Sequence, residues 1–159
     1  MDIVVWFTGM SGAGKTTIAR ALEADLIAAG RAVEVLDGDQ IRPNLFPDLG
    51  FSKQDRDENV RRAGYLAYLL AKHGVIVLVA LISPYREARN CVRKDLEKNG
   101  IRFLEVYVNA PEEVCVARDP RYPKQPYEPP LNAEIECRTA SEDLEISKKR
   151  VWDAVFDHH

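Results

Sequence analysis

The chain has 159 residues, 46% of them hydrophobic and 30% charged, a composition that predicts a single soluble globular domain over 1–159. The net charge of -3 argues against a general affinity for nucleic acids or membranes, so an anionic ligand has to be met by local clusters of arginine. No stretch is apolar for the length of a membrane span, and the acidic start lacks a secretory pattern, so we expect a cytoplasmic protein.

Strand and helix signals alternate along the chain. The expected strands are 3–7, 32–36, 75–82, 103–108 and, more weakly, 134–137, and the expected helices are 16–29, 55–73, 84–98, a short helix begun by Pro111, and 147–156. Only the proline-rich stretch 120–130 interrupts this rhythm and reads as a loop. The alternation predicts an α/β fold of the P-loop NTPase type, with a parallel sheet between two layers of helices. Cys91, Cys115 and Cys137 lack metal-ligand spacing and are expected to be free thiols.

The run from Gly9 to Thr16 fits a phosphate-binding loop between an apolar strand and an amphipathic helix. Its glycines let backbone N–H groups wrap around phosphate oxygens. Lys15 is placed to reach the outer phosphates, and the Thr16 hydroxyl is a ligand for Mg²⁺. A glycine-rich turn without a ligand is the alternative, but the Lys-Thr pair and the flanking elements favour binding of a nucleoside triphosphate.

The acid that would organise Mg²⁺ is missing from its usual place at the end of the 75–82 strand. No guanine-reading Asn-Lys-x-Asp motif is present either, which weakens a GTPase interpretation. Asp37 and Asp39 end the second strand, at the sheet edge that faces the ligand in open α/β folds. A carboxylate there can hold Mg²⁺ and accept a proton from an attacking hydroxyl, although Asp-Gly is also ordinary turn chemistry.

A basic and aromatic segment follows the acidic turn. Arg42 and Arg56 can bind anionic oxygens, Phe51 offers a flat face for a base, and Asn59 lies one helical turn beyond Arg56. A solvated amphipathic helix is the alternative for any single arginine here. The Ile82-Ser83-Pro84-Tyr85-Arg86 string ends the central strand at the same edge. These residues together indicate a second, anionic ligand beside the nucleotide.

In order and spacing, the motifs resemble the adenylyl-sulfate kinase (APS kinase) family, whose members phosphorylate adenosine 5′-phosphosulfate. The similarity covers about 4–130 and rests on seven strings: the phosphate loop through Thr17, Leu36-Asp37-Gly38-Asp39 with Arg42, Leu49-Gly50-Phe51-Ser52 with Asp55-Arg56 and Asn59, Ile82 to Arg86, Glu105-Val106-Tyr107-Val108, Arg118-Asp119-Pro120, and Pro126-Tyr127-Glu128-Pro129-Pro130.

The resemblance implies roles for individual positions. ATP and Mg²⁺ would be held by the phosphate loop, with Arg118 near the adenine and with Thr16 and Asp39 near the metal; the loop residues are Gly9, Ser11, Gly12, Ala13, Gly14, Lys15, Thr16 and Thr17. The sulfated nucleotide would be bound by Asp39, Arg42, Phe51, Arg56, Asn59, Ile82 and Ser83. The catalytic set would be Lys15, Asp39, Asp37 in support, and Ser83, although Ser83 has no base beside it to make it a phosphate carrier. The resemblance also implies a homodimer.

One feature departs from the family pattern. Members usually carry a lid of about twenty residues between the Arg-Asp-Pro and Pro-Tyr-Glu motifs, whereas only 121–125 joins them here, with Lys124 as a candidate lid cation. Either the lid is deleted or the printed sequence omits part of it. We favour omission, because loops that gate active sites are the least ordered parts of a protein.

The sequence therefore predicts an ATP-dependent kinase that forms 3′-phosphoadenosine 5′-phosphosulfate and ADP, with no nucleic-acid or membrane partner. Two alternatives stay open at this point. One is a P-loop kinase for another small alcohol or nucleotide, in which the arginine cluster binds a different anion. The other is a nucleotide-binding module without turnover.

Overall fold

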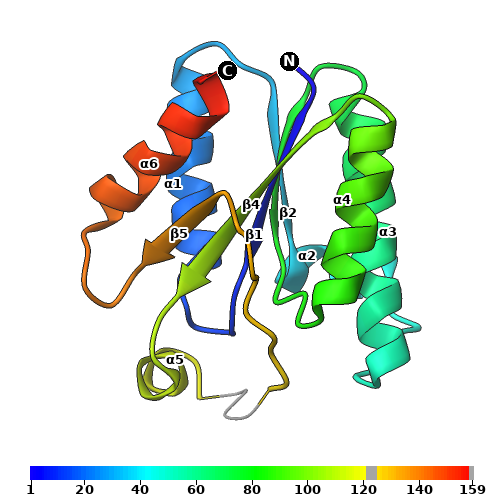
Figure 1. Ribbon diagram of the computed structural model, residues 1–159, viewed down its shortest axis with the longest axis vertical. Helices are drawn as coiled ribbons and strands as arrows, with labels where there is room; N and C mark the ends of the chain where they lie inside the picture. Colours follow the sequence, from blue (N-terminus) through cyan, green and yellow to red (C-terminus); the bar gives the residue numbers. More distant parts are fainter. Residues whose placement is uncertain (121–124, 158–159) are drawn as a thin grey trace.

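The apolar run at the start of the chain forms β1 (Ile3–Thr8), the middle strand of a parallel sheet (Figure 1). The computed structural model describes residues 1–120 and 125–157, and within them the sheet has five strands in the order β2-β3-β1-β4-β5. The other strands are β2 (Val33–Asp37), β3 (Ile76–Ala80), β4 (Arg102–Asn109) and β5 (Ile135–Arg138). Both neighbours of β1 run parallel to it, and the register sets Trp6 beside Val79 on β3 and Glu105 on β4.

Helices cover both faces of the sheet, because the strand residues that point to one face and those that point to the other are both apolar. The helices are α1 (Lys15–Ala28), α2 (Gly38–Leu45), α3 (Lys53–Ala71), α4 (Arg86–Lys98), α5 (Glu112–Arg118) and α6 (Leu144–Phe156). Ile3, Val5 and Phe7 pack against α1 and α6, whereas Val4 and Trp6 pack against α3 and α4. Figure 1 shows these two pairs of helices on opposite sides of the sheet. The three-layer α/β/α prediction is confirmed.

Some boundaries and one helix differ from the expectation. The sequence pattern did not predict α2. This helix begins with Gly38 and carries Pro43 in its interior, and both residue types usually disfavour a helix. The Asp37 side chain caps it instead, by accepting the Asp39 N–H. The last helix begins at Leu144, one turn earlier than expected.

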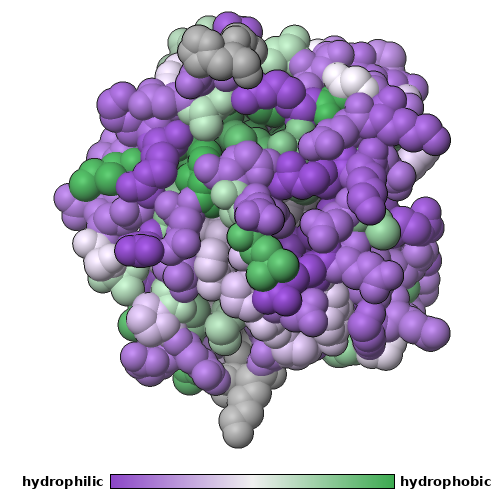
Figure 2. Space-filling view, in the orientation of Figure 1, coloured by the Kyte–Doolittle hydropathy of each residue, from purple (hydrophilic) through white to green (hydrophobic). Residues whose placement is uncertain are grey.

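The structure also bears on the predictions for the cysteines and for membrane-spanning segments. Cys115 and Cys137 are buried, Cys91 is exposed, and all three are free thiols, as expected. None of the helices in 1–120 and 125–157 has the length and apolar character needed to cross a bilayer. The face shown in Figure 2 is mainly hydrophilic, with apolar side chains in small separate areas. The expected lid and its cation Lys124 fall at 121–124, outside the described residues.

Candidate active site

The phosphate loop joins β1 to α1 and packs tightly against the backbone of β4 and α5. Gly12 has a φ of +83°, and a Cβ there would lie 2.4 Å from the carbonyl oxygen of Cys115 on α5. A Cβ on Gly9 would lie 2.4 Å from the carbonyl oxygen of Val108. Both positions therefore need glycine, because side chains would push the loop away from the sheet. The loop geometry follows from close backbone contact with β4 and α5.

Lys15 is buried beneath this loop. Its Nζ donates to the carbonyl oxygens of Gly9 and Met10, each at 2.8 Å. Burial lowers the pKa of Lys15 to about 8, because desolvation disfavours the charged form; Cys115 and the carboxylates of Asp39, Asp37 and Asp119 oppose this shift. The ammonium group is thus held by the loop's own carbonyls at the place where a phosphate would approach.

One pocket of about 960 Å³ opens above the carboxyl ends of the strands. It brings together nearly all of the sequence-predicted site residues: Ser11, Gly12, Gly14, Lys15, Thr16, Thr17, Asp37, Asp39, Arg42, Phe51, Arg56, Asn59, Ile82, Ser83 and Arg118. Gly9 and Ala13 are the two that do not line it. Ala13 is fully buried in the core, and Gly9 packs closely against the backbone of Val108. These two residues support the loop from beneath.

The two aspartates of the acidic turn have different surroundings. Asp37 is 7% exposed, and its Oδ1 accepts the Asp39 N–H at 3.0 Å, which starts α2. Asp39 lies in the first turn of α2 and lines the pocket. Its carboxylate and the Thr16 hydroxyl are hard oxygen donors of the kind that Mg²⁺ takes, so the donor chemistry fits. The described residues contain no cluster of three His, Cys, Asp or Glu side chains that could hold a metal.

Two arginines flank Phe51 at the far side of the pocket. The Arg42 guanidinium carbon lies 4.5 Å from the centre of the Phe51 ring, and that of Arg56 lies 5.6 Å from it. Arg42 also donates to the carbonyl oxygens of Leu49 and Gly50, and Arg56 Nε donates to the Phe51 carbonyl oxygen at 2.9 Å. Phe51 nevertheless remains 64% exposed, so part of its ring is accessible to a ligand.

Asn59 and the N-terminus of α3 complete this side. Ser52 caps the helix as its type predicts, accepting the Asp55 N–H at 3.1 Å. Asn59 lines the pocket, and its buried Oδ1 has no hydrogen-bond partner among the described residues. A buried amide oxygen without a partner is costly, which indicates a ligand or water at that point.

The Ser83 side chain lies in the interior behind the pocket. Its Oγ accepts the Trp6 Nε1 hydrogen at 3.0 Å and donates to Thr8 Oγ1 at 3.0 Å, and the residue is 2% exposed. The hydroxyl therefore belongs to an interior network and has no base beside it. A phosphate carrier has to be exposed and activated, so this placement does not favour that role for the Ser83 hydroxyl, and its catalytic assignment stays a prediction. The contribution of Ser83 to the pocket is through its backbone.

Arg118 connects the phosphate loop to the end of β5. Its Nη1 donates to Thr139 Oγ1 and to the Ala13 carbonyl oxygen, both at 3.3 Å. Several lining residues were not among the predicted site residues, and these include Asp119, Gln125, Thr139, Glu142, Leu144 and Ser147. Asp119 accepts the Ser11 hydroxyl at 2.7 Å, and Gln125 Oε1 accepts the Ser11 N–H at 3.2 Å. Thr139 follows the carboxyl end of β5, so the sheet-edge rule was a usable signal for it.

The fold and the phosphate loop define the chain as a P-loop protein of the kinase type. The family model for adenylylsulphate kinase matches residues 1–138. The chain therefore belongs to the adenylylsulphate kinase family, whose members are phosphotransferases that act on an alcohol group. A gluconokinase from Sinorhizobium meliloti, at 15% identity and a TM-score of 0.63, shares the fold.

Relatives and solved structures of this family match along nearly the whole chain. The adenylyl-sulfate kinase of Microcystis aeruginosa is 52% identical, with 98% of this chain and 92% of that protein covered. That of Rippkaea orientalis is 53% identical, covering 94% and 89%. The Mycobacterium tuberculosis APS kinase CysC, solved in complex with AMPPNP and APS, has a TM-score of 0.91 at 37% identity, covering 97% of each chain.

Proposed function

We propose that this chain transfers the γ-phosphoryl group of ATP to the 3′-hydroxyl of adenosine 5′-phosphosulfate, giving 3′-phosphoadenosine 5′-phosphosulfate and ADP. The observation that supports this most strongly is a shared pocket. The phosphate loop with Lys15, the cluster of Arg42, Phe51 and Arg56, and Asp39 all line the same pocket. A triphosphate and a second anionic nucleotide can therefore meet there, as in-line transfer requires.

At the donor end, the phosphate loop would bind the ATP phosphates through Gly9 to Thr17. Lys15 would exchange its loop carbonyl partners for phosphate oxygens, and this would neutralise charge that develops during transfer. Arg118 would lie beside the adenine. Mg²⁺, held by Thr16, Asp39 and the phosphates, would supply charge neutralisation of the β- and γ-oxygens.

At the acceptor end, Phe51 would stack on the adenine, and Arg42 and Arg56 would bind the anionic phosphosulfate group. Asn59 Oδ1 would gain the partner that it lacks. The backbone of Ile82 and Ser83 would form the wall behind the acceptor. Asp39 would orient the 3′-hydroxyl and accept its proton, while Asp37 would hold Asp39 through the cap of α2.

For the assembly and location, we propose a cytoplasmic homodimer built from one domain over 1–159. The support for the dimer is the family resemblance. A related APS kinase from Thiobacillus denitrificans is hexameric, although this chain covers only 28% of that longer chain. Size-exclusion chromatography with light scattering distinguishes a mass near twice 18.0 kDa from a monomer or a hexamer.

The test of the activity is an acceptor panel. The purified chain is incubated with ATP, Mg²⁺ and either adenosine 5′-phosphosulfate, adenosine 5′-monophosphate or gluconate, and products are separated by anion exchange and weighed by mass spectrometry. We expect one phosphoryl group to be added to the phosphosulfate, at the 3′ position. Transfer to another acceptor in preference would indicate a different small-molecule kinase. ATP binding without transfer to any acceptor would indicate a module without turnover.

A further inference from the structure

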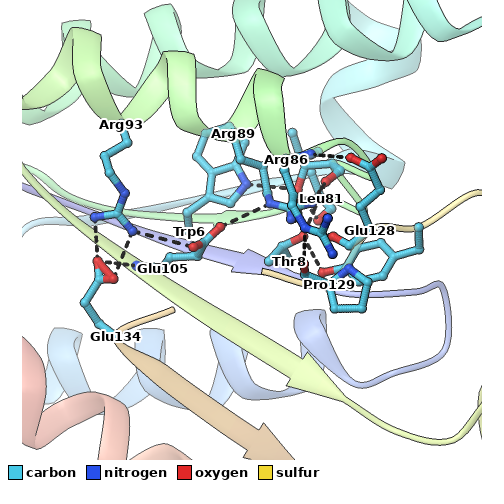
Figure 3. Close-up of polar contacts among 12 residues, drawn as sticks. Trp6, Thr8, Leu81, Arg86, Arg89, Arg93, Glu105, Glu128, Pro129 and Glu134 are labelled. Carbon is cyan, nitrogen blue, oxygen red and sulfur yellow. Dashed lines mark hydrogen bonds and ion pairs between the residues drawn. The ribbon is translucent and has the colours of Figure 1, made fainter. Parts of the chain in front are cut away.

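Two segments that are far apart in sequence lie side by side, as the contacts of Arg86 with Glu128 and Pro129 show (Figure 3). Residues 82–86 follow β3, and residues 125–130 precede β5. The Glu128 N–H donates to the Pro84 carbonyl oxygen at 2.8 Å, and Glu128 Oε1 accepts the Arg86 N–H at 3.0 Å. Arg86 Nε donates to the Pro129 carbonyl oxygen at 2.6 Å. Pro84 and Arg86, which directly follow the acceptor wall, are therefore joined to the Pro-Tyr-Glu segment by three hydrogen bonds.

Arg89 on α4 lies at the centre of this junction. Its side chain is 1% exposed, and its three nitrogens point to three different parts of the chain. Nη1 donates to the Ser83 carbonyl oxygen and Nη2 to the Glu128 carbonyl oxygen, each at 2.6 Å. Nε donates to Glu105 Oε2 on β4 at 3.1 Å, which neutralises the buried charge.

Ser83 is the point at which the wall needs such support. It is the single residue other than glycine with a positive φ, at +44°, within the described part of the chain. A left-handed conformation costs a residue with a Cβ free energy, so it persists only where surrounding contacts determine it. The Ser83 hydroxyl is fixed by Trp6 and Thr8, and its carbonyl oxygen is fixed by Arg89.

We propose that Arg89 is a positioning residue for the acceptor nucleotide. It holds the Ser83 peptide in its left-handed conformation and ties it to Glu128, so that the wall formed by Ile82 and Ser83 is set before the substrate arrives. Arg89 does not line the pocket and acts on the acceptor only through Ser83. This inference rests on the proposed function, since it assigns the wall to the acceptor and not to ATP.

Holding Ser83, Glu128 and Glu105 at the same time needs a guanidinium group. A lysine at this position keeps the charge opposite Glu105, but it is a point donor and cannot reach two carbonyl oxygens and a carboxylate along three fixed directions. The neighbouring Arg93, one turn along α4, provides a contrast. It binds Glu134 at 2.7 Å and Glu105 at 3.5 Å, and it contacts neither Ser83 nor Glu128. Figure 3 shows both arginines reaching from the same helix toward Glu105.

The test compares Arg89→Lys with the matched control Arg93→Lys in the full chain, with adenosine 5′-phosphosulfate and ATP varied in turn. For Arg89→Lys we expect the KM for the phosphosulfate to rise about ten-fold or more, as for a lost charge-assisted hydrogen bond, while the KM for ATP changes less than about two-fold. For Arg93→Lys we expect both KM values to stay near those of the unchanged chain. Thermal unfolding is recorded for each variant.

A purely structural role predicts another pattern: a lower Tm for Arg89→Lys with both KM values unchanged, and this result would overturn the proposal. A rise in both KM values together would overturn it as well. If Arg89→Lys does not fold, Glu105→Gln serves in its place, because it removes the counter-charge of Arg89 and leaves its two carbonyl partners; the same KM split, of smaller size, is expected, and its absence refutes the role. If the unchanged chain does not phosphorylate the phosphosulfate at all, it is the proposed function that fails.

Discussion

Asp37 Oδ1 accepts the backbone N–H of Asp39 at 3.0 Å, so the first carboxylate of the acidic turn starts the helix that carries the second. Asp37 is nearly buried at the end of β2, and Asp39 lines the pocket from the first turn of α2. The two acids are therefore inequivalent. One shapes the backbone, and the other faces the ligands.

The pair should respond differently to the same substitution. We expect Asp39→Asn to lower kcat by at least about a hundred-fold, because it removes the proton acceptor, with a small effect on ATP binding. Asp37→Asn should have a milder effect on kcat, because the amide oxygen can still accept the Asp39 N–H. Steady-state kinetics and ATP binding by calorimetry measure both effects. The reverse ranking would show that the catalytic role belongs to Asp37.

Replacing Lys15 should abolish transfer without harming the fold. We expect Lys15→Met to lower kcat/KM by at least about a hundred-fold, since a preorganised charge on the transferred phosphoryl group is lost. Its Tm without ligand should be equal or higher, because a desolvated cation is replaced by an apolar side chain of similar length. Substantial transfer by the folded variant would refute the phosphate-loop assignment.

The lowered pKa of Lys15 predicts the pH dependence. Only the protonated form attracts phosphate, so kcat/KM for ATP should fall as pH rises through about 8. The kcat profile should fall at higher pH, because bound phosphates favour the charged form. For stability the sign is opposite. The unfolded lysine binds its proton more tightly than the folded one, so the ligand-free protein gains stability between pH of about 8 and 10.5. A Lys15→Met control should lose this rise.

The aromatic and basic cluster should act on the acceptor alone. We expect Arg56→Ala to weaken binding of adenosine 5′-phosphosulfate by about 1.5–3 kcal/mol, roughly ten- to a hundred-fold in KM, with little change for ATP. Phe51→Ala should cost about 1–3 kcal/mol through lost stacking. Paired KM values test both variants. Loss of ATP affinity with acceptor affinity intact would move this cluster to the donor site.

The close packing of α3 on α4 gives a prediction for stability. A Cβ on Gly64 would lie 2.8 Å from a methyl carbon of Val92, which is a stiff side chain. Gly64→Ala gains about 1 kcal/mol of helix propensity but incurs overpacking of about 1–3 kcal/mol, so we expect net destabilisation of roughly 1 kcal/mol. Urea unfolding measures it. In the double variant with Val92→Ala the two effects should be less than additive, and strict additivity would argue against the clash.

The sequence was sufficient where local signals agree with the tertiary structure. The Gly9–Thr16 loop, the alternation of strands and helices, and the residues at the carboxyl ends of β1 to β3 were all predictable, because the motif and the sheet-edge rule specify them. The helix α2 was not, because its Pro43 and Gly38 oppose it locally and a side-chain cap restores it.

The buried hydrogen bonds behind the site were also not predictable from the sequence. Arg89 reads as one more charge on an amphipathic helix, and its burial depends on Glu105 and Glu128, which lie on other segments. Likewise, the sequence does not show that the Ser83 hydroxyl accepts a hydrogen bond from Trp6 in the interior. Such pairings are set by the packing of distant segments, which single-sequence patterns do not encode.

The central place of β1 has a consequence for the protein while it is being made. The ribosome completes the nucleotide-binding motif within the first tenth of the chain, yet the strand in front of it finds its two partners only at residues 76–80 and 102–109. Until then Val4 and Trp6 have no sheet to join, and the motif has no scaffold. A nascent chain that stalls before Asn109 would thus leave one or both edges of this apolar strand without a partner. It would be a client for chaperones and would have no affinity for ATP.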